Sequence, residues 1–90
     1  MKVPQILVVA PPPIRTPKGP LAPKFAGGER KCAGLAEAYA RVSAELDCRF
    51  FDAGSVIATS NLDGVHLDAE QHLVLGRALS RVVQPLLKGA

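Results

Sequence analysis

The residues whose types and spacing could do chemistry lie close together, in the run from Asp63 to Asp68. Asp63 and His66 are three positions apart with Gly64 between them, and a turn at a glycine can bring such a pair into contact. A carboxylate that accepts a hydrogen bond from Nδ1–H of an imidazole fixes the tautomer and leaves Nε2 to take a proton from a hydroxyl nucleophile. The spacing therefore predicts an acid–base pair, with His66 as the base and Asp63 as the acid that orients it.

Two other interpretations of these residues stay open. Asp-Gly sequences are common in turns, so Asp63 can be a turn residue and His66 an ordinary surface side chain. A metal site is the second alternative, because two carboxylates and two imidazoles that suit Zn, Mn or Fe fall close together: Asp63, His66, Asp68 and His72. Their spacings match no common ligand pattern, and we expect no metal and no cofactor. His72 is instead expected to be a partly buried packing residue.

The elements that must position the pair alternate between strand and helix. Gln5 to Ala10 is a continuous aliphatic run stopped by three prolines, which predicts a strand buried on both faces, as in a parallel sheet covered by helices. The period becomes helical from Glu29 to Asp47. Its apolar stripe consists of Leu35, Tyr39, Val42 and Leu46. A short strand from Cys48 to Gly54 would complete a parallel β-α-β unit.

A second helix is expected to follow Asp68. Asp68 has the character of an N-cap, with Gln71 completing a capping-box-like pair, and Pro85 is expected to kink or fray the last turn. The loop of residues 55–67 then lies between a strand end and a helix start, where open α/β sheets bind ligands. Two strands do not form a stable sheet alone. The pattern therefore predicts part of a larger α/β fold, with the rest missing or supplied by another chain.

Composition limits the class of protein. Ninety residues that are 48% hydrophobic and 21% charged predict a single domain over residues 1–90. The net charge of +3 is spread along the chain and there are only four aromatic residues, one Tyr and three Phe, so we expect no nucleic-acid binding. No apolar run is long enough to span a membrane or to form a secretion signal. A cytoplasmic location is expected, with Cys32 and Cys48 as free thiols.

The segment of residues 11–28 is rich in proline and reads as a long irregular loop. Its prolines are compatible with a polyproline II ligand for an SH3-like groove. We favour a stiff wall beside a substrate cleft.

Several motifs together resemble one family. The run Asp63-Gly-Val-His-Leu-Asp68, the strand and prolines from Ile6 to Ile14, and the block Phe50-Phe-Asp-Ala-Gly54 resemble the C-terminal part of SGNH hydrolases, also called the GDSL esterase/lipase family. The arylesterase-like or acyl-thioesterase-like branch is most similar, with its loop like Lys24 to Gly28 before a helix. The resemblance covers roughly Ile6 to Leu86.

This resemblance implies a flavodoxin-like three-layer fold, of which the chain would hold a β-α-β-α part. It also implies cleavage of small-molecule esters or thioesters without a cofactor. His66 would be the catalytic base and Asp63 its orienting acid.

The sequence departs from the family where the nucleophile should be. The Gly-Asp-Ser block and the two middle blocks that supply a glycine and an asparagine to the oxyanion hole are missing. Asn61 is not in the family's asparagine context. The serines, none of them in a nucleophile motif, are Ser43, Ser55, Ser60 and Ser80. Because a triad that has lost such members loses orders of magnitude in rate, we expect negligible esterase activity from this chain alone.

Two functions follow from this sequence. The first is the C-terminal segment of an SGNH-type ester hydrolase, which needs a complementing N-terminal segment. The alternative is a non-catalytic α/β remnant that acts as a binding or assembly module and self-associates through its uncovered sheet edge and apolar helix faces.

Overall fold

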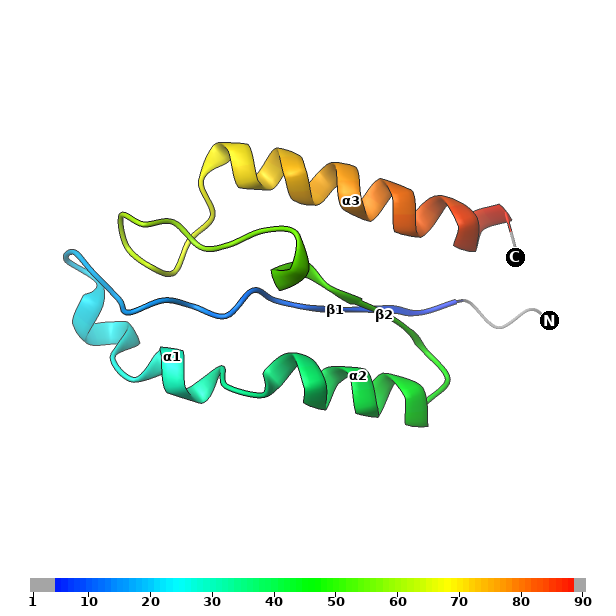
Figure 1. Ribbon diagram of the computed structural model, residues 1–90, viewed down its shortest axis with the longest axis horizontal. Helices are drawn as coiled ribbons and strands as arrows, with labels where there is room; N and C mark the ends of the chain where they lie inside the picture. The colour runs from blue at the N-terminus through cyan, green and yellow to red at the C-terminus, as the bar shows by residue number, and fades with distance from the viewer. Residues whose placement is uncertain (1–4, 89–90) are drawn as a thin grey trace.

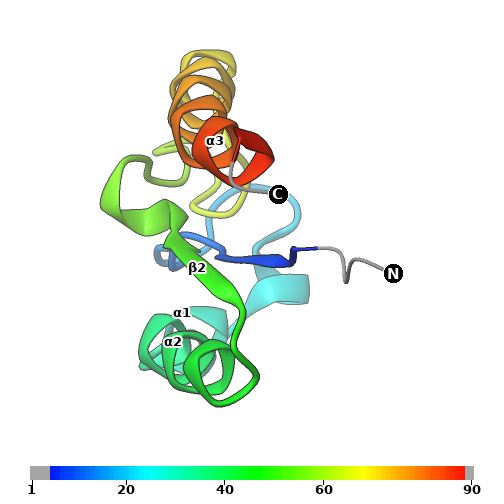
Figure 2. The ribbon, with the colours of Figure 1, turned by 90° about the vertical axis from the view of Figure 1, so that its right-hand side faces the viewer.

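The computed structural model describes residues 5–88, and in this part of the chain two parallel strands lie between helices (Figure 1). In chain order the strands and helices are β1 (Leu7–Ala10), α1 (Gly28–Lys31), α2 (Leu35–Glu45), β2 (Arg49–Asp52) and α3 (Ala69–Lys88). Viewed along the strands, α3 lies on one side of the sheet and α1 and α2 on the other (Figure 2). The predicted partial α/β fold is confirmed, with two helices rather than one between the strands.

The carboxyl ends of the two strands lie at the same end of the sheet. They pair in parallel, with Leu7 opposite Arg49 and Ala10 opposite Asp52. β1 ends at Ala10 because the prolines that follow have no N–H to donate to a ladder. β2 ends at Asp52, whose carboxylate accepts the N–H of Gly54 at 3.0 Å and starts a short 3-10 turn. The segments that follow both strands therefore emerge side by side.

The helix expected from Glu29 to Asp47 is two helices. α1 and α2 are separated by residues 32–34, and Gly34 has a φ of +76°. Only glycine adopts this left-handed conformation without a steric cost, and it takes the backbone off the helical path. The apolar periodicity did not reveal this break, because the stripe begins at Leu35, after the gap.

The strand β1 is not buried on both faces, and this expectation was wrong. Ile6 is 56% exposed and Val9 is 36% exposed. The described residues give β1 only one neighbouring strand, so one edge has no cover. In residues 5–88 the buried hydrophobic side chains are only those of Ala10, Ala53 and Ile57.

The predicted apolar stripe of α2 is also open to solvent. Tyr39, Val42 and Leu46 are 37%, 46% and 68% exposed. The buried residue of α2 is Ser43, whose hydroxyl donates to the backbone oxygen of Tyr39 at 2.7 Å. A serine can be buried inside a helix because this bond satisfies its hydroxyl.

The helix α3 begins where it was expected. The backbone oxygen of Asp68 accepts the N–H groups of Gln71 and His72, at 2.9 and 3.1 Å. The capping-box-like pairing is wrong, because Gln71 Oε1 accepts the N–H of Ala58 at 2.9 Å instead. His72 is exposed rather than partly buried, although it stands at helical spacing with the half-buried Leu75 and Leu79. The helix continues through Pro85 to Lys88, so its last turn does not fray there.

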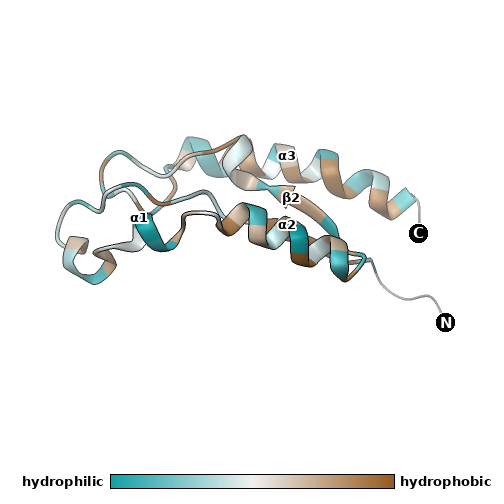
Figure 3. Ribbon diagram, turned by 60° about the horizontal axis from the view of Figure 1, so that its bottom comes forward, coloured by the Kyte–Doolittle hydropathy of each residue, from teal (hydrophilic) through white to brown (hydrophobic). Residues whose placement is uncertain are grey.

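The chain exposes more surface than a compact protein of its size. Its accessible surface is 6553 Å², whereas a compact protein of this mass exposes about 5,000 Å². The radius of gyration is 15.2 Å, against about 12 Å for a compact chain of this length. Hydrophobic residues recur along the helices and β2 (Figure 3). In residues 5–88 no helix is both long and apolar enough to cross a membrane.

Candidate active site

The loop of residues 60–66 brings Asp63 and His66 together. Asp63 Oδ2 lies 2.6 Å from Nδ1 of the His66 ring. Asp63 Oδ1 accepts the backbone N–H groups of Val65 and His66, at 2.8 and 3.0 Å. Both carboxylate oxygens are therefore engaged, and the predicted contact between the two side chains is present.

These hydrogen bonds determine the charge of Asp63. The N–H of Val65, followed by the N–H and the ring of His66, lowers the pKa of the Asp63 carboxyl from 3.8 to about 2. At neutral pH Asp63 is therefore a carboxylate, which accepts Nδ1–H and favours the tautomer with a free Nε2. The His66 side chain is 62% exposed. An oriented imidazole that is open to solvent is suited to receive a proton from an approaching hydroxyl.

Short backbone hydrogen bonds close this loop on itself. The N–H of Ser60 donates to the oxygen of His66 at 2.7 Å, and the N–H of Gly64 donates to the oxygen of Ser60 at 2.8 Å. The Ser60 hydroxyl accepts the N–H of Leu62 at 3.0 Å. Ser60, the first residue of the loop, is therefore held in place by these bonds, and it is only 4% exposed.

The proline-rich segment after β1 holds the other side of the loop, and the two segments lie side by side in Figure 1. The N–H of Arg15 donates to the oxygen of Gly64 at 2.8 Å, and the N–H of Lys18 donates to the oxygen of Asp63 at 2.9 Å. The Arg15 guanidinium also donates to the side-chain oxygen of Asn61. This second support could not be predicted, because nothing in the sequence links Arg15 to Asn61.

Gly64 is required where these two segments meet. Its φ is +79°, and a Cβ at this position would lie 2.6 Å from the backbone oxygen of Thr16. Neither the dihedral angle nor the space admits a side chain. The backbone freedom expected of Gly64 is therefore used to bring the Asp63 carboxylate up to His66.

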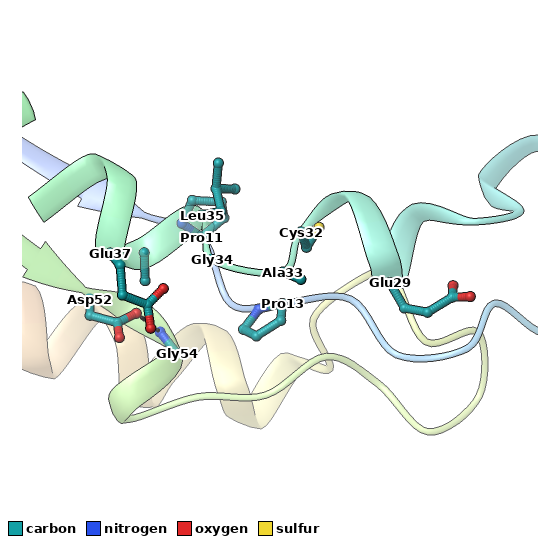
Figure 4. Close-up of a pocket in the computed structure, with 11 residues that line it drawn as sticks. Pro11, Pro13, Glu29, Cys32, Ala33, Gly34, Leu35, Glu37, Asp52 and Gly54 are labelled. Carbon is teal, nitrogen blue, oxygen red and sulfur yellow. Dashed lines mark hydrogen bonds between the residues drawn. The ribbon is translucent and has the colours of Figure 1, made fainter. Parts of the chain in front are cut away.

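A cavity of about 260 Å³ lies at the carboxyl ends of the two strands (Figure 4). Pro11 and Pro13 line it after β1. Asp52 at the end of β2 and Gly54 just beyond it also line the cavity, and the start of α2 closes it. These prolines therefore line a cavity, and the substrate cleft expected beside them stays a prediction.

In residues 5–88 no serine hydroxyl is hydrogen-bonded to the His66 ring. Ser43 and Ser60 are bonded as described above, the Ser55 hydroxyl donates to the oxygen of Asp52, and the Ser80 hydroxyl accepts from Gln84. Within residues 5–88, no three His, Cys, Asp or Glu side chains are gathered to hold a metal ion. Both cysteines are free thiols.

Solved structures of esterases resemble this chain closely. A carbohydrate acetylesterase family member from Sinorhizobium meliloti is 46% identical, with a TM-score of 0.87, over 97% of this chain and 41% of its own. The native aryl esterase of M. smegmatis is 40% identical, with a TM-score of 0.85, over 92% of this chain and 39% of its own. A second carbohydrate acetylesterase from Sinorhizobium meliloti is 38% identical, with a TM-score of 0.83 and the same coverage of 92% and 39%.

The chain belongs to the SGNH hydrolase family. The resemblance expected from the block of residues 63–68 is thereby confirmed. This SGNH hydrolase chain spans about two fifths of the length of the solved structures it matches. No family model and no curated protein matches the chain.

Proposed function

We propose that this chain supplies the acid–base part of an SGNH-type serine hydrolase that cleaves small-molecule esters. The single observation that carries the proposal is the 2.6 Å contact between Asp63 Oδ2 and Nδ1 of a solvent-open His66 ring. The family membership of the chain supports it. The nucleophilic serine and the oxyanion donors come from a complementing N-terminal segment, which makes up the rest of the catalytic domain.

In this proposal His66 transfers the protons of an acyl exchange. Nε2 removes the proton of the serine hydroxyl as its oxygen attacks the ester carbonyl carbon, and Asp63 stabilises the imidazolium that forms. The imidazolium then gives this proton to the departing alkoxide, which leaves as an alcohol and an acyl-serine remains. His66 next deprotonates a water that attacks the acyl-serine, and the serine regains its proton when the carboxylic acid is released.

The substrate class follows from the neighbours, whose names identify carbohydrate acetylesterases and an aryl esterase. We propose short acyl esters, acetyl esters first, as substrates of the complete hydrolase, and thioesters as a second class. No metal or other cofactor takes part, because the base, the nucleophile and the oxyanion donors are all protein groups.

The test reconstitutes the domain. The chain is mixed with a fragment of the Sinorhizobium meliloti acetylesterase that is 46% identical to it. The fragment is the part of that esterase outside the matched region, and turnover of p-nitrophenyl acetate is measured. His66→Ala is expected to lower kcat by about 10⁴-fold or more, and Asp63→Asn by about 10³- to 10⁴-fold, because each removes a member of a triad. The matched control is His72→Ala, which removes an exposed histidine of α3 and is expected to leave kcat unchanged. Equal rates for the unaltered chain and His66→Ala would reject the catalytic assignment.

A second candidate function is the non-catalytic binding or assembly module. The observation that favours it is that all four serines are engaged elsewhere, so the chain itself offers His66 no nucleophile. The same assay separates the two functions. A complex that forms normally but hydrolyses no ester with an intact Asp63 and His66 would favour the module.

A further inference from the structure

The position of the His66 ring depends on the loop that carries it. The His66 side chain is 62% exposed. In residues 5–88 the ring makes one hydrogen bond, between Nδ1 and Asp63 Oδ2. An open ring with one partner takes its position from that partner. The direction in which Nε2 points therefore depends on where the backbone of Asp63 is held.

Arg15 contacts the loop of residues 60–66 on both sides of Asp63. Its backbone N–H donates to the oxygen of Gly64 at 2.8 Å, just after Asp63. Its guanidinium donates to the side-chain oxygen of Asn61, just before Leu62 and Asp63. In the described part of the chain, no other hydrogen bond joins a side chain of this loop to a side chain of another segment. One residue therefore brackets the acid of the catalytic pair.

The segment that carries Arg15 is packed on two sides. A Cβ at Gly54 would lie 3.1 Å from Cδ of Pro13, and the side chain of Ile14 fills the space that a Cβ at Gly28 would need. The residues just before Arg15 therefore lie against the segment after β2 on one side and against the start of α1 on the other. Proline also fixes φ, which limits the movement of this segment further. Arg15 can therefore serve as a fixed point for the loop.

We propose that Arg15 is a positioning residue of the hydrolase. By holding Asn61 and Gly64, it fixes the Asp63 carboxylate against the His66 ring and so sets the direction in which Nε2 meets the serine hydroxyl. Arg15 acts only through Asp63 and His66, and it transfers no proton. This inference rests on the proposed function.

The expected effect is on the rate of hydrolysis and not on the stability of the chain. A bond between two exposed side chains contributes little to the free energy of unfolding. A displacement of about 1 Å at a catalytic group can nevertheless lower a rate about 100-fold. Loss of the bond between Arg15 and Asn61 leaves the two backbone hydrogen bonds from residues 15–18 in place. We therefore expect a partial displacement and a smaller loss of rate.

The bond, and not the charge of Arg15, carries this role. Its partner Asn61 is a neutral amide, and in residues 5–88 no carboxylate lies within ion-pair distance of the guanidinium. A neutral acceptor holds the guanidinium without involving the Asp63 carboxylate, which stays with His66. Removal of the Asn61 amide breaks the bond and leaves the charge in place, whereas removal of the guanidinium takes away both. Variants at the two positions therefore separate the bond from the charge.

The first test uses the chain alone and a spectroscopic readout. Nitrogen NMR of an imidazole distinguishes its two neutral tautomers, and spectra are recorded at about pH 8.5, above the ordinary pKa of histidine. We expect His66 in the unaltered chain to hold the tautomer with Nδ1–H. Arg15→Met and Asn61→Leu are each expected to give a mixture of tautomers. The ring of His72, an exposed histidine of α3, is the internal reference and should not change.

The second test measures kinetics in the reconstituted domain. Arg15→Met and Asn61→Leu are each expected to lower kcat about tenfold and to leave KM within about twofold, because they displace the base and not the substrate. The double variant should lose no more than either single variant, since both remove the same bond. Asn61→Asp keeps an acceptor oxygen for the guanidinium and is expected to retain kcat. The matched control is Arg81→Met, at an exposed arginine of α3, which should leave kcat and the tautomer unchanged.

The outcomes separate this inference from the proposed function. If the reconstituted domain hydrolyses no ester, the NMR test still decides whether Arg15 positions the ring. Circular dichroism shows whether each variant is folded, and Asn61→Leu, which changes an exposed side chain, covers the case in which Arg15→Met unfolds. An unchanged His66 tautomer and an unchanged kcat in Asn61→Leu would overturn the proposal. A loss in Arg15→Met that Asn61→Leu does not share would also overturn it, because the charge and not the bond would then be responsible.

Discussion

The loop of residues 60–66 has its polar groups hydrogen-bonded, whereas the outer face of β1 and α2 leaves apolar side chains exposed. In the loop, Asp63 has both oxygens hydrogen-bonded, and Ser60 and Gly64 close the backbone. On the outer face, Val42 and Leu46 are 46% and 68% exposed. The loop is complete because its hydrogen bonds join near neighbours and one adjacent segment. The face is incomplete because hydrophobic burial needs area, which two strands and three helices do not supply.

Gly64→Ala should destabilise the loop of residues 60–66 more than any other change. A methyl group at this position would lie 2.6 Å from the Thr16 oxygen, at a φ of +79°. We expect the free energy of unfolding to fall by about 2–4 kcal/mol, because the strained dihedral and the clash act together. Urea denaturation measures the loss.

The matched control for this change is Gly76→Ala in α3, where nothing lies within 4 Å of the added carbon. We expect it to raise the free energy of unfolding by about 0.5–1 kcal/mol, because alanine favours a helix over glycine. If both glycine variants had the same effect, the close contact with Thr16 would not be what holds the loop.

The next expected change in stability is smaller and concerns Thr59, a buried residue beside the loop whose hydroxyl is not hydrogen-bonded within residues 5–88. Thr59 is 5% exposed and its hydroxyl has no hydrogen-bond partner in the described part of the chain, whereas the hydroxyl of the adjacent Ser60 accepts from Leu62. Thr59→Val should therefore raise the free energy of unfolding by about 1 kcal/mol, and Ser60→Ala should lower it by about 1 kcal/mol. Thermal and urea unfolding of the two variants would contradict this difference if both shifted stability in the same direction.

The smallest expected effect is the loss, at low pH, of the stabilisation that the Asp63 carboxylate gives to the loop of residues 60–66. The N–H of Val65, then that of His66 and the imidazole, lowers the pKa of Asp63 from 3.8 to about 2. Because the folded pKa is the lower one, the stabilisation is complete above pH 3.8 and is lost as the pH falls through about 2.

Amide exchange from about pH 5 to about pH 2 measures this loss. The protection factors of the Val65 and His66 amides are expected to fall in this window. The amide of Ala58, whose acceptor Gln71 does not titrate, is the internal reference and should keep its protection factor. A parallel fall at Ala58 would mean that the whole chain unfolds and that the Asp63 carboxylate is not the cause.

Much of the site could be predicted from the sequence because its interactions are local. Asp63, Gly64 and His66 lie within four positions, so the chain between them has few ways to fold, and a turn at Gly64 is sufficient for contact. The bond between Arg15 and Asn61 could not be predicted. It joins residues 46 positions apart, and their contact depends on how the whole chain folds.

The elements were predictable where a residue type constrains the backbone directly, as the prolines after Ala10 do. Burial was predicted less well. The apolar spacing of α2 identified its stripe, but not that Val42 and Leu46 have no cover within this chain. The exposure of His72 has a similar explanation, because spacing indicates which face of a helix a residue lies on but not how deeply that residue is buried.

The sequence by itself determined the order of strands and helices and the pairing of Asp63 with His66, because both depend on steric limits and contacts between near neighbours. Only the tertiary structure decided which apolar side chains are covered, since burial depends on how much surface other elements bring. It also decided the hold of residues 15–18 on the loop of residues 60–66, because that contact depends on how the chain packs over long distances.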